Sequence, residues 1–274
     1  MNRRDDLSIG SGRRWSREAL TGTVALLGQG GVALGRFLAD GVLFSWQALW
    51  GVLRGRIDFR QWLLQMEAIG VQGLPLVLLT VGASGMVLAV YTAGQFRRFG
   101  AINLVGGLVT ASIVREIGPV FTAIVIAARS GSAIAAEIGT MKVTEQIDAL
   151  RALATNPVEY LLIPRLLAAM VALPLLTVAA DIAGAVGGYL VGLSAGISSR
   201  MYINSALKMT ELDFFWSGLV KAVIFAWLIV LVSARQGFRV EYGAAEVGRA
   251  TTSAVVISIL LVHATDYLLA LIFV

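Results

Sequence analysis

Long apolar runs alternate with short polar and basic segments along most of the chain. Five of these runs have close to the roughly 20 residues that a helix needs to cross a bilayer, so they predict five transmembrane helices. The predicted spans are residues 74–94, 104–128, 161–194, 215–233 and 251–274. The third run is longer than one perpendicular crossing requires, and we expect its helix to tilt or to extend beyond the lipid.

The chain before the first predicted span shows a different pattern. Residues 1–19 are polar and basic, and we expect them to be poorly ordered. Residues 20–55 are apolar and glycine-rich, yet their polar side chains lie within about 40° of one another on a helix. Those side chains are Gln29, Arg36, Asp40, Gln47 and Arg54. A single polar stripe favours an amphipathic helix in the membrane interface, with a true span packed against polar partners as the alternative.

Composition supports an integral membrane protein. Hydrophobic residues make up 57% of the chain and charged residues 14%, against roughly 25% charged residues in soluble domains. We therefore predict an all-α membrane protein with one membrane domain over residues 20–274. The absence of cysteine excludes disulfides and thiolate chemistry, and the single histidine, His263, leaves no histidine-based metal site. No phosphate-loop motif occurs, so the chain cannot bind ATP by that route.

The net charge of +5 comes from Lys and Arg residues that cluster beside the predicted spans, which argues against a nucleic-acid partner. Most of the 22 Lys and Arg residues lie on one side of the membrane if the N-terminus is cytoplasmic. The outer loops then hold Arg97, Arg98, Arg200 and Lys208. The positive-inside rule thus predicts a cytoplasmic N-terminus and a C-terminus on the opposite side.

Two adjacent charges, Arg115 and Glu116, lie near the centre of the second predicted span. Inserting a charged side chain at the centre of the bilayer costs roughly 2.5–3.5 kcal/mol on insertion scales, so the presence of each of these charges requires an explanation. On a straight helix these neighbours point about 100° apart, and we expect each to need its own partner or a wet cavity. Gly118 and Pro119 would loosen the helix just beyond them.

Three further charges, Asp181, Lys221 and Asp266, lie inside predicted spans, where such residues usually face a bundle interior. His263 precedes Asp266 by three residues and shares its helix face, which predicts a hydrogen-bonded polar pair. Lys221 lies near the outer end of its span, and we expect its long side chain to reach the interface.

Small residues recur at four-residue spacing in two places. Gly184, Gly188 and Gly192 form one such face in the third span, and residues 127–139 contain another. Small faces let helices approach closely in lipid, so we interpret both as helix-packing surfaces. Arg129 and Glu137 flank the second face and predict an ion-pair network there, with an ordinary interfacial anchor as the alternative for Arg129.

The polar segment between the second and third spans contains a predicted short helix over residues 142–154. Its apolar and charged side chains fall on opposite sides, and Asn156-Pro157 ends it because proline disfavours helix at the preceding residue. The apolar positions are Val143, Ile147, Leu150 and Leu153, and the charged positions opposite them are Glu145, Asp148 and Arg151, with Lys142 at the start of the helix. Such a helix has the shape that a permease offers to a partner ATPase; a surface helix covering the bundle end is the alternative.

Several motifs resemble the MlaE/YrbE family, whose members are permeases of ABC systems that move phospholipid between membranes together with MCE-domain proteins. The motifs are "REIGPV", "ARSGSAIAAEIGTM", "TEQIDAL", "NPVEYLLIPR", "LPLLT" and "GRATTSAVV". They occur in order, and the resemblance covers about residues 34–274.

The resemblance implies a homodimer in the bacterial inner membrane, with an interfacial helix before five spans in each subunit. Two ATPase subunits, which bind ATP and Mg, would dock on the cytoplasmic coupling helices over residues 142–154, so this chain would have no catalytic site and no cofactor of its own. MCE-domain proteins would sit on the outer face, and some systems add a STAS-domain subunit beneath. The lipid cavity would lie at the dimer interface.

On this basis we expect Arg115, Glu116 and Pro119 to line the lipid cavity or to gate it, with a structural pair that locks spans together as the alternative. Arg129 and Glu137 would then contact the ATPase or the coupling helix. Two other functions stay open: an ion-coupled transporter that uses the charges inside the spans, and a membrane scaffold that transports nothing.

Overall fold

The computed structural model describes residues 59–273 and five isolated positions before them, Ala39, Gly41, Leu43, Trp46 and Trp50. The chain divides into two compact units, residues 1–46 and 47–274, and residues 59–273 belong to the second. The predicted basic segment and the polar stripe of the predicted interfacial helix lie outside the described residues.

Five helical segments of the described chain are long and apolar enough to cross a membrane, which confirms the five predicted spans and the all-α class. They are Phe59–Arg98, Ile102–Val143, Pro157–Ser194, Leu212–Phe238 and Gly243–Ile272. Each helix continues beyond the apolar run that predicted it, because backbone hydrogen bonds can continue where side chains become polar. No strand occurs in residues 59–273.

The spans are built from the following elements. The first contains α2 (Phe59–Met66), η1 (Glu67–Val71) and α3 (Leu74–Arg98). The second contains η2 (Ile102–Leu104), α4 (Val105–Ser112), η3 (Ile113–Ile117), α5 (Gly118–Ile126), η4 (Ala127–Gly131) and α6 (Ser132–Val143). The others are α8 (Pro157–Ser194), α10 (Leu212–Phe238) and α11 (Gly243–Ile272), and the short helices α7 (Gln146–Ala152) and α9 (Ser199–Met209) connect spans.

The second span changes its helix type along its length, because η3 and η4 are π-helical turns within it. Pro119 stands at the start of α5, directly after η3. Proline has no N–H to donate and its ring crowds the preceding turn, so a wider turn accommodates it without breaking the helix. The two π-helical turns carry Arg115, Glu116 and Arg129, which the sequence singles out.

The long helix α8 packs closely against its neighbours through glycine. The α-carbon of Gly85 in α3 faces the carbonyl of Gly184, so an added methyl group at residue 85 would overlap it. A methyl group at Gly188 would lie 2.7 Å from Val109, and one at Gly192 would lie 2.6 Å from the Tyr202 ring. The Gly184, Gly188 and Gly192 face therefore meets α3, α4 and α9.

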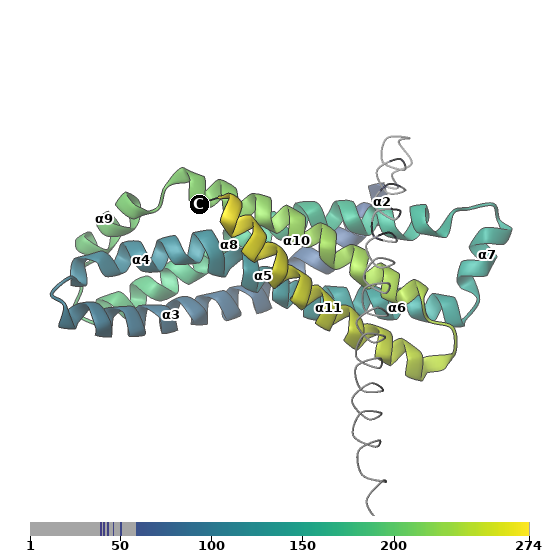
Figure 1. The fold of residues 1–274 in the computed structure, drawn as a ribbon, viewed down its shortest axis with the longest axis horizontal. Coiled ribbons are helices and arrows are strands. Elements are labelled where there is room, and N and C mark those ends of the chain that lie inside the picture. The colour runs from purple at the N-terminus through teal and green to yellow at the C-terminus, as the bar shows by residue number, and fades with distance from the viewer. Residues whose placement is uncertain are drawn as a thin grey trace, which may run out of the picture. The chain divides into compact units, whose positions relative to one another are not determined.

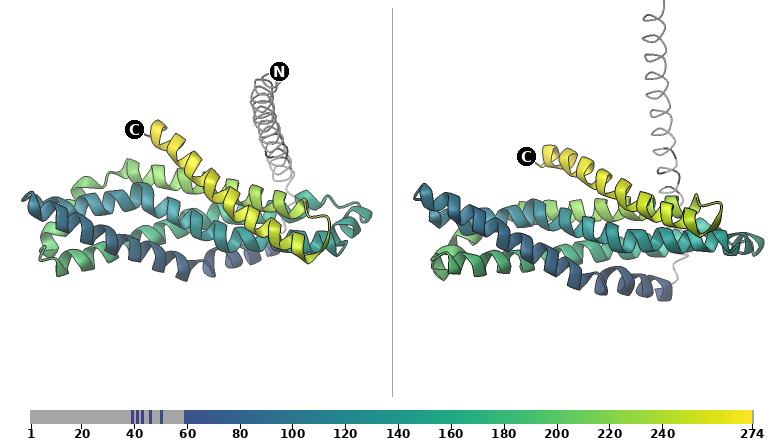
Figure 2. Two further views of the ribbon diagram at one scale, coloured as in Figure 1. Left: turned by 60° about the horizontal axis from the view of Figure 1, so that its bottom comes forward. Right: turned by 90° about the horizontal axis from the view of Figure 1, so that it is seen from below.

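The connections lie at two opposite ends of the bundle (Figures 1 and 2). One end, here the α7 end, holds α7 and the turn between α10 and α11. The other, here the α9 end, holds α9 and the turn between α3 and α4. Asn156 caps α8 by accepting a hydrogen bond from Val158 N, and Ser198 caps α9 by accepting one from Met201 N.

The predicted helix over residues 142–154 is shorter than expected, because α7 spans only Gln146–Ala152. Lys142 lies in the last turn of α6 instead, and Glu145 reverses the chain in the left-handed region with φ of 58°. The expected apolar face is also only partly buried against the bundle: Ile147 is buried, whereas Leu153 is 76% exposed. The helical spacing of apolar residues continues through residues 143–147 of the sequence. The chain must nevertheless reverse its direction there, because α6 and α8 run antiparallel.

Candidate functional site

Three charged side chains from three spans meet inside the bundle. Lys221 of α10 lies 2.5 Å from Glu116 Oε2 in η3 and 2.9 Å from Asp266 Oδ1 in α11, measured from its Nζ. Its side chain is 1% exposed. The expectation that Lys221 reaches the interface is therefore wrong, because two carboxylates inside the bundle supply better partners than solvent.

Arg115 adjoins this group, and we call Arg115, Glu116, Lys221 and Asp266 the charge cluster. Arg115 Nε lies 3.7 Å from Glu116 Oε1, so the two neighbours do interact, contrary to the expectation from a straight α-helix. The physical reason is η3, whose π-helical turn does not keep the 100° spacing. The Arg115 guanidinium also lies 5.1 Å from the centre of the Phe214 ring, a cation–π distance.

The charge cluster is formally neutral, with two cations and two carboxylates. It joins the second, fourth and fifth spans through side chains rather than through backbone. Removing one partner of a buried ion pair costs about 3–5 kcal/mol, because the other charge is left uncompensated. Chemically, the arrangement is a set of ion pairs that a helix movement can make or break.

His263 does not form the predicted pair with Asp266. Its Nδ1 lies 2.9 Å from the carbonyl oxygen of Ile259 in its own helix, and its side chain is exposed. Asp266 contacts Lys221 instead. Spacing within one helix predicted the shared face, but the buried Lys221 on a neighbouring helix forms a charge-assisted contact with the carboxylate.

Arg129 and Glu137 each bind within the bundle. Arg129 donates hydrogen bonds of 2.8 Å to the Ala68 carbonyl and to Gln72 Oε1, which ties η4 to the first span. Glu137 Oε2 lies 2.8 Å from Nη2 of Arg165, a buried residue of α8 that the sequence reading did not assign to a site. Its signal was a lone arginine at the start of a long apolar run.

Arg129 and Glu137 also line one polar hollow of about 410 Å³ between the first and second spans. Its walls consist of Leu64, Gln65, Ala68, Ile69, Gln72, Arg129, Ser130, Ala133, Ile134 and Glu137. Arg129 therefore has partners at η1 and in Gln72 just after it, and Glu137 has one on α8.

The predicted coupling residues lie at the α7 end and form an exposed polar surface. Asp148 Oδ1 lies 2.8 Å from Arg151 Nη1, and Asp148 Oδ2 lies 3.7 Å from Lys142 Nζ. Glu145 is exposed in the turn before α7. Ile147 is fully buried and holds this short helix against the bundle, so the charged side points outward.

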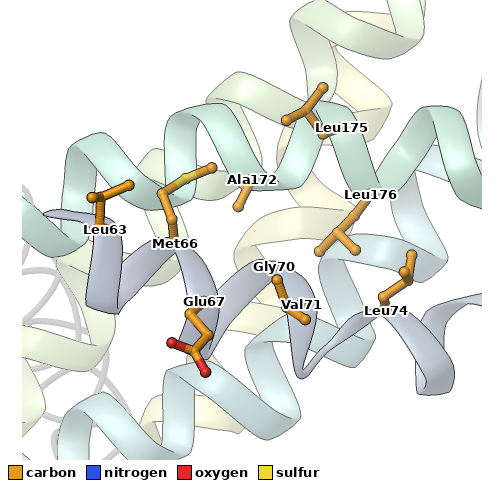
Figure 3. A pocket seen from close by; sticks show the side chains of 9 residues that line it. All are labelled: Leu63, Met66, Glu67, Gly70, Val71, Leu74, Ala172, Leu175 and Leu176. Atoms are coloured by element: carbon orange, nitrogen blue, oxygen red, sulfur yellow. The ribbon is translucent and has the colours of Figure 1, made fainter.

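An apolar cavity of about 410 Å³ lies between the first span and α8 (Figure 3). Eight of its nine lining residues are apolar or glycine, and the ninth is Glu67. Figure 3 shows the Glu67 carboxylate pointing away from α8, while Met66, Ala172 and Leu176 face the space between the helices. The sequence reading missed this cavity, although an isolated acid in an apolar run was a usable signal.

Asp181 of α8 is buried, and its carboxylate lies directly against the α-carbon of Gly118, where any Cβ would overlap it. Its Oδ1 has no hydrogen-bond partner among the described residues. Gly118 begins α5, so this acid lies beside the point where the second span changes from a π-helical to an α-helical turn. Pro119 itself is buried at the same junction.

Comparison with known proteins gives consistent matches. A family model described as Permease MlaE matches residues 62–272. A Rickettsia typhi protein named "Probable ABC transporter permease protein" is 40% identical over 228 residues, which make up 83% of this chain and 88% of the relative. A Synechocystis protein with the same description is 39% identical over 220 residues, covering 80% and 84% of the two chains. The Arabidopsis thaliana chloroplast protein TRIGALACTOSYLDIACYLGLYCEROL 1 is 36% identical over 229 residues, covering 83% and 65%.

Proposed function

This chain belongs to the MlaE family of ABC transporter permeases, and we propose that it is the membrane subunit of a transporter that moves phospholipid between the bacterial inner membrane and an MCE-domain protein. It has no catalytic site of its own in this proposal. Partner ATPase subunits bind ATP and Mg and supply the energy.

The observation that carries the proposal is the charge cluster. An apolar bundle gains little from buried charges as such, since well-packed apolar residues often stabilise a protein equally well. Charges joining three spans are useful where the spans must take up two arrangements, because ion pairs are directional and can be exchanged. We therefore assign Arg115, Glu116, Lys221 and Asp266 to the gate of the lipid pathway, with Pro119 and the π-helical turn η3 as its hinge.

The α7 end is the proposed docking surface for the ATPase. The charged groups there belong to Lys142, Glu145, Asp148 and Arg151. The buried side chain of Ile147 fixes α7 against the bundle, so that a force on α7 is passed to the bundle. ATP-driven movement of the partner would push α7 against α6 and α8. Glu137 and Arg165 join α6 to α8 by an ion pair, so they would carry the movement toward the charge cluster.

Lipid as the cargo class has two supports. The name of the Arabidopsis relative is that of a galactolipid. The apolar cavity between the first span and α8 falls within the usual size range of small-ligand sites, about 300–1,000 Å³, and its lining suits an acyl chain.

The complex that we propose is a homodimer with the lipid cavity at the dimer interface. The MCE-domain protein lies at the α9 end, the ATPase and any STAS-domain subunit at the α7 end, and the N-terminus in the cytoplasm. The support for this arrangement is the family membership together with the positive-inside distribution of Lys and Arg.

The proposal can be tested by reconstituting the chain with its ATPase and MCE partner in liposomes and measuring ATP-dependent transfer of a labelled phospholipid. Transfer should require all three components and should fall at least tenfold in Glu116→Gln, while Arg98→Gln, at the α9 end, should behave as wild type. Transport by this chain alone, driven by an ion gradient, would establish the ion-coupled alternative instead. Unchanged transfer by a variant lacking Arg115 and Glu116 would favour the scaffold.

A further inference from the structure

A second hollow, of about 570 Å³, lies at the α9 end of the bundle between η2 and α9. Its walls consist of Asn103, Leu104, Ser198, Arg200, Met201, Asn204, Ser205, Lys208 and Met209. Six of these residues are polar or basic, and none is acidic. The composition differs from both cavities described above, each of which contains a glutamate.

The two cations of this hollow are available to a ligand. Neither Arg200 nor Lys208 forms an ion pair within residues 59–273, and both are exposed. They lie eight residues apart on α9, which is about 12 Å along a helix, with Asn204 between them on nearly the same face. Amide and guanidinium groups donate hydrogen bonds, so this face presents donors to an incoming anion.

Contacts on the opposite side of α9 fix that helix in place. Tyr202 is buried, the α-carbon of Gly106 in α4 lies against its carbonyl, and its ring lies beside Gly192 of α8. Burial raises the pKa of the Tyr202 phenol, so its hydroxyl stays neutral. Gly107 N donates a 3.0 Å hydrogen bond to Ser205 Oγ, which joins α9 to the start of the second span. The donors therefore stand on a rigid support.

The hollow adjoins the start of the apolar run of the second span. Asn103 and Leu104 immediately precede α4, where the apolar part of the second span begins. Leu104, Met201 and Met209 add an apolar wall beside the donors. A phospholipid presents the same sequence of groups at this depth, with a phosphate in the headgroup layer and glycerol esters and acyl chains below it.

We propose that this hollow is a binding site for the phosphate group of a phospholipid in the membrane leaflet at the α9 end, held by Arg200, Lys208, Asn103 and Asn204. Arginine binds phosphate through two parallel hydrogen bonds, and lysine acts as a point charge. The proposal rests on the proposed lipid transport only for the class of ligand. Its role there is to hold a lipid on the surface next to the transport path, apart from the charge cluster.

The test is photocrosslinking in nanodiscs of neutral lipid doped with an anionic phospholipid that carries a diazirine near its glycerol. Mass spectrometry of the peptides then locates the crosslinks. Wild-type protein should be labelled within residues 103–104 and 198–209. Arg200→Gln with Lys208→Gln should lower this labelling about thirtyfold at subsaturating lipid, since each cation near an anionic lipid contributes about a fivefold gain in affinity. Arg200→Lys with Lys208→Arg should restore most of it.

Arg98→Gln is the matched control, because Arg98 is an exposed cation at the same end that does not line the hollow. Its labelling should equal wild type, and the melting temperatures of all variants should agree.

Labelling unchanged in the double glutamine variant would overturn the proposal. Loss of labelling with inorganic phosphate at concentrations near the lipid's own would show a free-phosphate site instead. Unchanged labelling with lost co-purification of the MCE partner would identify a protein-docking surface. Because no ATP is used, a failure of ATP-driven transport leaves this result untouched.

Discussion

Lys221→Met removes the central cation of the charge cluster while keeping an unbranched side chain of similar length. Glu116 and Asp266 then lose the partner that lies 2.5 Å and 2.9 Å away. Leaving a buried charge unpaired costs about 3–5 kcal/mol. Glu116 and Asp266 are 36% and 20% exposed, so water relieves part of the penalty and we expect the lower end, about 3 kcal/mol.

This loss should be visible in thermal unfolding of the detergent-solubilised protein. One kcal/mol shifts Tm by about 2–4 °C in chains of 150–250 residues, so Lys221→Met should lower Tm by about 6–12 °C. Lys208→Met is the control, because Lys208 is an exposed lysine of α9, and its change should stay within about 0.5 kcal/mol.

A double-variant cycle separates the ion pair from a simple packing defect. Glu116→Gln combined with Lys221→Met should destabilise by less than the sum of the single changes, because groups in one ion network couple by about 0.5–3 kcal/mol. The reasoning is refuted if the two effects add without coupling, or if Lys221→Met alone moves Tm by less than about 2 °C.

Three further outcomes are expected. Gly188→Leu should lower the yield and Tm of the folded protein, because a side chain there meets Val109 and Tyr202, whereas Gly94→Leu, with open space around it, should not; equal Tm values would contradict the packing. Glu145→Lys with Asp148→Lys should abolish co-purification of the ATPase. The melting temperature should stay within about 2 °C of wild type, since both side chains are exposed. Intact co-purification would show that α7 is not part of the docking surface. His263→Ala should change the free energy of unfolding by less than about 0.5 kcal/mol, because its hydrogen bond lies within its own exposed helix face; a loss as large as that of Lys221→Met would restore a role for the histidine.

The five spans could be predicted from the sequence because the requirement for crossing a bilayer is local. About 20 consecutive apolar residues satisfy it without reference to any other part of the chain. The glycine face of α8 was equally readable, since four-residue spacing alone brings Gly184, Gly188 and Gly192 to one side. The family motifs likewise lie in continuous stretches. The interfacial helix over residues 20–55 stays a prediction.

The partners of the charged residues could not be read in this way. Sequence placed Glu116, Lys221 and Asp266 inside spans, but Lys221 lies 105 residues from Glu116, and only the packing of α10 against η3 brings them together. The same limit explains the wrong pairing of His263 with Asp266 and the missed pairing of Glu137 with Arg165.

The sequence by itself determined where the chain is apolar enough to enter a membrane and which charges must be compensated there. Tertiary structure alone decided which charges compensate which, where α7 begins, and which donors surround the hollow beside α9. The physical reason is one of range: hydrophobic transfer is a sum over neighbouring residues, whereas an ion pair depends on a distance between helices that sequence separation does not encode.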